Sequence, residues 1–193
     1  MEKPAETTIY IPRLKKVVLL DHDRKMKVEL TVDQLERFSG QMKARGEKAT
    51  DPRSSSYSRR NSKRRTARPR TSAVFQSEYV TYQCETFAPR SPVVAQQYRE
   101  FGDLSAQLNA VLNRGWPPFA RMQVNAALAE EKLIPRKVAL LIPSKSFLGG
   151  RQQHFRSEHE LQSRLSESDQ KRIVATEEAI HAYPATTLLE YGK

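Results

Sequence analysis

Cysteine is almost missing from the 193 residues of this chain, since Cys84 is the only one. An intramolecular disulfide needs two cysteines, so a secreted disulfide scaffold is excluded, as is a zinc site built from several cysteine thiolates. We therefore expect a reducing compartment, with the protein intracellular rather than secreted, in the nucleus or the cytoplasm. The opening residues MEKPAETT carry two glutamates and no apolar stretch, so they do not resemble a secretory signal.

Long hydrophobic runs are also missing. The longest are VVLL at 17–20 and VALLIP at 138–143. A bilayer-spanning helix needs roughly 20 consecutive apolar residues. We therefore expect no membrane partner.

The sequence lacks the short motifs that identify common enzymes and cofactor sites. It contains no GxSxG, no CxxC and neither of the two glycine-rich phosphate loops. His159-Glu160 begins like a zinc-protease helix, but Ser163 stands where the second histidine ligand belongs. We expect a protein that is not an enzyme and holds no cofactor or metal. The alternative, an enzyme acting on nucleic acid or nucleotides, requires a pocket that gathers histidines and acids now far apart in sequence.

Acidic residues are absent from the stretch 52–72, which holds eight basic residues. The whole chain has 33 Lys and Arg against 22 Asp and Glu, a net charge of +11. Without those 21 residues the balance is 25 against 22, or +3. The excess positive charge is therefore concentrated in one short segment.

The pattern of apolar residues predicts an α+β protein in three parts. A small β-β-α element is expected at 1–46, with strands in TTIYIPRLKKVVLL and MKVELT and a helix that begins after Thr31 and ends near Gly46. Residues 47–72 form an Arg/Ser-rich arm, which we expect to be disordered because it offers too little apolar surface to offset the entropy of ordering. A larger α+β portion is expected at 73–193. As an alternative, 1–46 packs onto this portion to make one domain.

Within 73–193 the expected elements are helices and strands in mixed order. The stretch 74–87 alternates like one long strand or a hairpin, and helices are predicted at 93–114 and 119–134, the second stopped by Pro135. KVALLI at 137–142 reads as a buried strand. Ser157 and Glu160 are spaced like a capping box and predict a short helix through Leu165. A further helix is expected from Ser168 to Pro184.

The arm is the candidate nucleic-acid-binding segment. Arginine makes bidentate contacts with phosphates and stacks on bases, so a flexible run of arginines favours RNA or DNA as the partner. If all eight cations contacted duplex phosphates, the logarithm of the binding constant would fall with the logarithm of salt concentration with a slope of roughly −7. Such a run selects a polyanion but not a sequence. The candidate contact residues are Arg53, Arg59, Arg60, Lys63, Arg64, Arg65, Arg68 and Arg70.

Aromatic residues in and after the arm are candidates for stacking on bases. Exposed aromatic side chains on a sheet form a platform for unpaired bases. The alternative is that they pack in a core, because aromatic residues favour strands for packing alone. The candidates are Tyr57, Phe75, Tyr79 and Tyr82.

Ser62 follows Arg59-Arg60-Asn61 and is a candidate phosphorylation site. A phosphate there would add nearly two negative charges among eight positive ones and would weaken polyanion binding.

The main alternative function is assembly with proteins. In that interpretation the chain is a viral accessory or structural subunit, or another interaction factor, and the arm is a nuclear-localisation or packaging signal. The helices at 93–134 would then bind a protein partner or a second copy of the chain. The sequence alone does not decide between RNA and DNA, or between these two classes.

Overall fold

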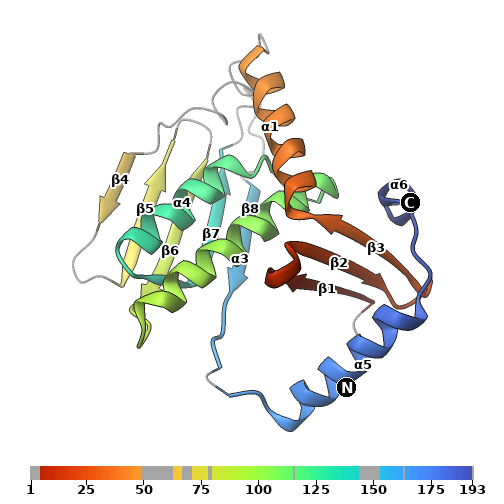
Figure 1. Cartoon of the computed structure of the whole chain (residues 1–193). Coiled ribbons are helices and arrows are strands. Elements are labelled where there is room, and N and C mark those ends of the chain that lie inside the picture. The colour runs from red at the N-terminus through yellow and green to blue at the C-terminus, as the bar shows by residue number, and fades with distance from the viewer. Residues whose placement is uncertain are drawn as a thin grey trace. The chain divides into compact units, whose positions relative to one another are not determined.

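The computed structural model describes residues 5–48, 63–66, 71–77, 80–114, 116–143, 153–162 and 164–192 (Figure 1). The chain divides into two compact units. The first comprises residues 1–37 and 161–193, and the second comprises residues 38–160. The two ends of the chain therefore belong to one unit, whereas the linear division into 1–46, 47–72 and 73–193 placed them in different parts.

The first unit contains a three-stranded antiparallel sheet in the order β1-β2-β3. Its strands are β1 (Glu6–Ile11), β2 (Lys16–Asp21) and β3 (Met26–Thr31). The expected β-β-α element is wrong in strand number, because the stretch around Pro12 is a reversal and not an interruption of one strand. Pro12 begins the 3-10 helix η1 (Pro12–Leu14), where its fixed φ and missing N–H are tolerated, and Lys15 completes the turn at a φ of 46°.

Helix α1 (Val32–Lys48) follows β3 and has the expected capping box. The Thr31 N–H donates to Gln34 Oε1 at 2.8 Å, and the Gln34 N–H donates to Thr31 Oγ1 at 3.2 Å. This reciprocal pair satisfies two donors at the helix start. The helix continues past Gly46, because one glycine within a helix lowers its stability without ending it.

Two C-terminal helices complete the first unit. They are α5 (Glu167–Ala182) and α6 (Leu188–Tyr191), and each begins with a capping box. Ala179 of α5 packs against Val18 and Leu20 of β2. The segment after α5 is joined to β3 by two backbone hydrogen bonds, from the Lys27 N–H to the Pro184 carbonyl and from the Thr186 N–H to the Lys27 carbonyl. The start and end of the chain thus share one hydrogen-bonded structure.

The second unit contains a five-stranded sheet in the order β4-β5-β6-β7-β8, with every neighbouring pair antiparallel. The expected hairpin after the arm is present as β5 and β6. The strands are β4 (Lys63–Thr66), β5 (Ser72–Gln76), β6 (Thr81–Phe87), β7 (Ile134–Ile142) and β8 (Gln153–Glu158).

Helices α3 (Pro92–Val111) and α4 (Phe119–Glu130) connect β6 to β7 and pack against each other (Figure 1). Both helices end in a Schellman motif, with the left-handed residue being Asn113 after α3 and Lys132 after α4. In the second case the Leu133 N–H donates to the Leu128 carbonyl at 2.9 Å. This motif, and not Pro135, ends α4, since Pro135 lies inside β7.

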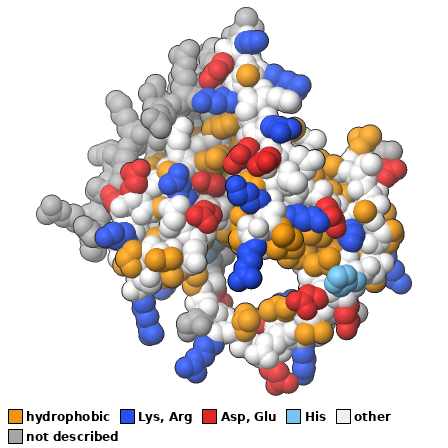
Figure 2. Space-filling view, in the orientation of Figure 1, with side chains coloured by type: hydrophobic (Ala, Val, Ile, Leu, Met, Phe, Trp, Pro, Cys, Tyr) orange, Lys and Arg blue, Asp and Glu red, His pale blue; other side chains and the backbone are white. Residues whose placement is uncertain are grey.

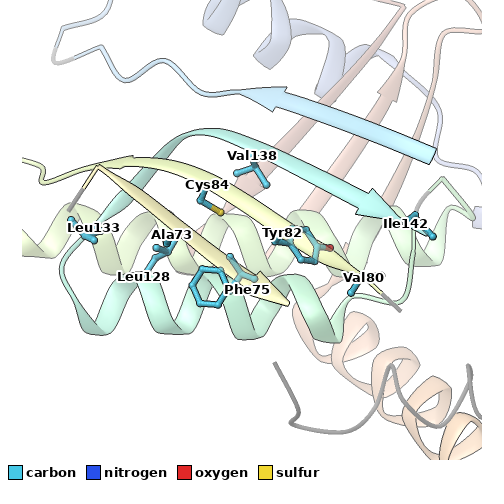
Figure 3. Close-up of a cluster of buried hydrophobic side chains, with 10 residues drawn as sticks. Ala73, Phe75, Val80, Tyr82, Cys84, Leu128, Leu133, Val138 and Ile142 are labelled. Atoms are coloured by element: carbon cyan, nitrogen blue, oxygen red, sulfur yellow. The ribbon is translucent and has the colours of Figure 1, made fainter. Parts of the chain in front are cut away.

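The core of the second unit lies between one face of the sheet and α4 (Figure 3). Alternate residues of the strands point to this face, which explains the alternation that the sequence shows. Val124 and Leu128 of α4 are each 1% exposed. The strand residues of this core are Ala73, Phe75, Tyr82, Cys84, Val138 and Ile142, and Val80 joins them just before β6.

The expected short helix from Ser157 through Leu165 is wrong. Ser157 lies in β8 opposite Val138, and the segment after β8 is not helical in the residues described. A capping box stabilises a helix only when the following residues bury an apolar face, whereas Leu161 and Leu165 are 46% and 61% exposed. The box that starts α5 is formed by Ser166 and Asp169.

Candidate nucleic-acid interface

The described residues of the basic arm are its two ends, at 47–48 in α1 and 71–72 at the start of β5, and the strand β4 between them. Lys63, Arg64 and Arg65 belong to this strand, which is an outer strand of the five-stranded sheet. A segment expected to be disordered thus contributes five described residues to a sheet, four in β4 and Ser72 in β5. The other arm residues singled out from the sequence lie outside the described residues: Arg53, Arg59, Arg60, Arg68, Arg70, Tyr57 and Ser62.

The backbone register of β4 fixes where its basic positions lie. Lys63 is opposite Gln76 of β5, Arg64 is opposite Phe75, and Arg65 is opposite Val74. Paired positions of antiparallel strands belong to the same face of a sheet. Positions 63 and 65 therefore continue the rows of Gln76 and Val74, and position 64 continues the row of Phe75.

The two faces of the sheet differ in exposure. Phe75 and its neighbours on one face form the core with α4, as Figure 3 shows. The intervening residues form the other face and are exposed or half-buried. We call this second surface the open face. Its residues are Val74, Gln76, Thr81, Gln83, Glu85, Lys137, Ala139, Leu141, His154, Arg156 and Glu158.

One row of the open face crosses the whole sheet and has a basic position at each end. Val74, Gln83, Ala139 and Arg156 are opposite one another on β5, β6, β7 and β8, and Arg65 of β4 is opposite Val74. The residues between the two arginine positions are small or uncharged. The row thus has an uncharged centre between two arginine positions.

The adjacent row has a lysine position at one end and a histidine at the other. Gln76, Thr81, Leu141 and His154 are opposite one another, and Lys63 is opposite Gln76. Arg156 Nε donates to His154 Nε2 at 3.3 Å, so the two basic residues of β8 are hydrogen-bonded along the strand. Both outer strands of the sheet therefore present basic residues in these two rows.

The third row is different because its charges compensate each other. Glu85, Lys137 and Glu158 are opposite one another, and Lys137 Nζ lies 3.5 Å from Glu158 Oε1. Arg136, at an irregularity in β7, places its guanidinium over the Phe87 ring at 5.5 Å. Of the three rows, only the first has an arginine position at both ends, and the third holds two acids and one lysine.

Two of the candidate stacking residues are buried. Phe75 and Tyr82 are 4% and 7% exposed and belong to the core. Burial raises the pKa of Tyr82 to about 12, so its hydroxyl stays protonated. Base stacking on these two rings is incompatible with this structure, and packing is their role. Tyr79 lies outside the described residues.

Cys84 is a structural thiol. It is 2% exposed, and burial raises its pKa to about 11, with the Arg121 charge acting in the opposite direction. A thiolate is the reactive form of cysteine, and at neutral pH this group holds its proton. Cys84 is therefore a core residue and a poor nucleophile.

The side of the molecule seen in Figure 2 carries basic and acidic side chains interspersed. Within the described residues, no three His, Cys, Asp or Glu side chains gather as they would around a metal ion. In the same part of the chain, no helix is both long and apolar enough to cross a membrane.

The strand β8 and its contribution to the open face were not predicted from the sequence. His154 and Arg156 were not among the candidate contact residues, since the polar sequence QHFRSE shows no alternation of apolar and polar residues. An outer strand that is exposed on both faces needs no such alternation. The one available signal was KVALLI, a buried strand that needs a pairing partner.

Comparison with known proteins identifies no relative: no family model, no curated protein and no solved structure matches this chain.

Proposed function

We propose that this protein binds RNA or DNA without catalysing a reaction, through the basic arm and the adjoining rows of the open face. The observation that carries the proposal is the pairing of β4 with β5, which joins the most basic stretch of the chain to an outer strand of the folded sheet. A tethered cluster of cations gains affinity by releasing counterions from phosphates. The sheet gives that cluster a fixed neighbour that a free tail would lack.

The arrangement of the two basic rows suits a strand of phosphates crossing the sheet. Cationic positions on β4 and β8 lie on either side of a floor formed by Val74, Gln83 and Ala139. A floor of small and uncharged side chains lets a backbone approach closely, and the Gln83 amide can donate to or accept from a base edge. Phosphate contacts would supply affinity, and such amides would supply what base selectivity there is.

The test compares three fluorescein-labelled ligands of equal length by anisotropy: single-stranded RNA, duplex RNA and duplex DNA. We expect one of them to bind more tightly than the others, because the flat floor fits one backbone geometry better. Heparin serves as a control polyanion without bases. Equal affinity for all three ligands and for heparin would contradict a nucleic-acid interface on the sheet.

Assembly with a protein is the second candidate, and exposed apolar side chains favour it. Val93 and Phe101 of α3 are 62% and 54% exposed. In this case the arm acts as a nuclear-localisation or packaging signal. Sedimentation of the chain alone separates the two proposals, because assembly with a second copy predicts a defined oligomer that dissociates when Phe101 is replaced by Ser.

A further inference from the structure

Four polar side chains of the second unit form one continuous chain of hydrogen bonds. Arg121 of α4 donates from NH2 to Tyr98 Oη at 3.1 Å, and Tyr98 Oη lies 3.2 Å from His159 Nδ1. On the other side of the imidazole, His159 Nε2 lies 3.0 Å from Ser157 Oγ. The Tyr98 and His159 rings meet edge to face with centroids 5.6 Å apart. We call these four residues the Ser157 relay.

The elements of the sheet and helices hold the relay in place. Tyr98 comes from α3, Arg121 from α4, and Ser157 from β8. The backbone of His159 is fixed by its N–H, which donates to the Arg136 carbonyl at 2.8 Å. The relay therefore joins Arg121 to Tyr98, 23 positions away, and Tyr98 to His159, 61 positions away.

The hydrogen-bond distances fit both neutral tautomers of His159, and the tautomer with its proton on Nε2 gives the relay a direction. A guanidinium can only donate, so Tyr98 Oη accepts from Arg121 and its own proton is available for His159 Nδ1. A neutral imidazole that accepts at Nδ1 carries its proton on Nε2, which then donates to Ser157 Oγ. The proton of the Ser157 hydroxyl is left to donate outward. Each donor in such a sequence polarises the next, so the terminal hydroxyl is a strengthened donor.

Burial and charge keep the imidazole neutral in the unliganded protein. Burial, followed by the nearby Arg121 charge, lowers the pKa of His159. Burial raises the pKa of Tyr98, which therefore remains a phenol. Asp103 is the carboxyl group close to Arg121, and it is also bonded by Asn125 and lies 3.6 Å from Arg99. Two arginines thus lie near one carboxyl at the Arg121 end of the relay, whereas Arg156, Glu158 and Glu160 are the charged residues next to Ser157 and His159 in the chain.

We propose that the exposed end of the Ser157 relay binds a phosphate group. The Ser157 hydroxyl would donate to a phosphate oxygen, and an anion there would favour the protonated imidazole, whose two N–H groups can both donate. The group could belong to inorganic phosphate or a phosphate monoester, or to the backbone of a nucleic acid. The relay is built without any arm residue, so this inference does not depend on the proposed function.

Proton NMR of the histidine rings tests the proposal, because the chain has only four histidines, at positions 22, 154, 159 and 181. The pKa of each is measured in chloride, in inorganic phosphate and with a short single-stranded oligonucleotide, at constant ionic strength. We expect phosphate to raise the pKa of His159 by about half a unit or more, a threefold or larger linkage. The exposed His181 on α5 serves as internal control and should not shift.

Two variants separate the relay from general ion binding. Ser157→Ala removes the terminal donor, and Tyr98→Phe removes the link to Arg121 while keeping the ring. Each should abolish most of the phosphate-induced shift at His159, with an unchanged fold confirmed by the remaining histidine signals. A full shift retained in Ser157→Ala would overturn the proposal, as would equal shifts at all four histidines or no shift with either ligand.

The source of the phosphate group is read from a third variant in which the eight arm cations are replaced by Gln. A shift with inorganic phosphate that persists in this variant identifies a site for free phosphate groups. A shift that only the oligonucleotide produces, and that the variant loses, identifies a nucleic-acid phosphate held near the relay by the arm. Either result supports a phosphate site at Ser157. If the arm does not bind nucleic acid, the shift produced by inorganic phosphate can still be measured.

Discussion

Arg24 is the residue that joins the turn after β2 to the end of the chain. Its Nε donates to Asp21 Oδ2 at 2.6 Å, and its NH1 and NH2 donate to the carbonyls of Glu190 and Tyr191 at 3.1 and 2.6 Å. The guanidinium also lies over the Tyr191 ring at 5.6 Å. One side chain thus donates to two carbonyls in the last turn of α6.

Replacing Arg24 with Ala should therefore lower the free energy of unfolding by about 1–2 kcal/mol, a value reduced because the side chain is 37% exposed. Urea unfolding followed by circular dichroism measures this change. Arg13→Ala is the matched control, because Arg13 is exposed in η1. A loss no larger than that of the control would contradict the role assigned to Arg24.

Asp21 gives a prediction about pH. Burial would raise its pKa, but hydrogen bonds from the Arg24 N–H and side chain, the Arg24 charge and the Asp23 N–H together lower it. A carboxyl group whose pKa is lower when folded stabilises the fold fully above its unfolded pKa of about 4, and this stability is lost as the pH falls through the folded value. Asp21→Asn should thus be less stable than the parent at pH 7, with the difference shrinking in acid. Urea midpoints between pH 7 and pH 2 measure it, and a constant difference would be contrary to this account.

At the scale of elements, the order of residues in the arm should matter as well as their charge. Exchanging KRRT at 63–66 with SSSY at 54–57 keeps the composition but removes the basic residues from β4. We expect nucleic-acid affinity to fall by roughly tenfold, or about 1.4 kcal/mol, because the cations no longer adjoin the open face. The parent and the exchanged chain are compared by anisotropy at one salt concentration. Equal affinities would mean that the arm acts as a free tail.

Arg156 of β8 tests the opposite side of the open face. Arg156→Gln should weaken binding and reduce the magnitude of the salt slope by about 0.7–0.9, the value for one lost phosphate contact. Arg13→Gln removes the same charge from the first unit and should leave the slope nearly unchanged. The prediction fails if the two variants behave alike.

Elements with their own local signals could be predicted from the sequence. The Thr31–Gln34 capping box, the apolar stripe of α3 and the alternation of β5 and β6 depend on residues close together along the chain. The end of α4 was harder to predict from the sequence, because Lys132 adopts a left-handed conformation that its residue type does not favour. The strand β8 was not predicted, because an exposed outer strand is specified by its partner β7 and not by its own pattern.

The candidate site was predictable only in part, for a similar reason. Eight cations within 21 residues are visible as composition. Their relation to Arg156 and His154 depends on the pairing of five strands, and β7 and β8 follow the helices α3 and α4 in the chain. For Phe75 and Tyr82, an aromatic residue in a predicted strand is compatible with base stacking and with core packing. The position of α4, which covers this face of the sheet, decides for packing.

At the scale of the whole molecule, charge is distributed unevenly. Of a net charge of +11, eight positive charges belong to the stretch 52–72, and +3 remains for all other residues. A near-neutral body gives little general attraction for polyanions, so the arm should supply most of the binding affinity and Arg156 one further phosphate contact.

The most direct test takes the ligand that binds most tightly among single-stranded RNA, duplex RNA and duplex DNA. Its binding constant is measured at several salt concentrations, for the intact protein and for the variant with all eight arm cations replaced by Gln. The account predicts tight binding by the intact protein, with a slope that approaches roughly −7 for a duplex if every cation contacts a phosphate and that becomes nearly flat in the variant. The same steep slope in both proteins would contradict the central claim, because the affinity would then come from another surface.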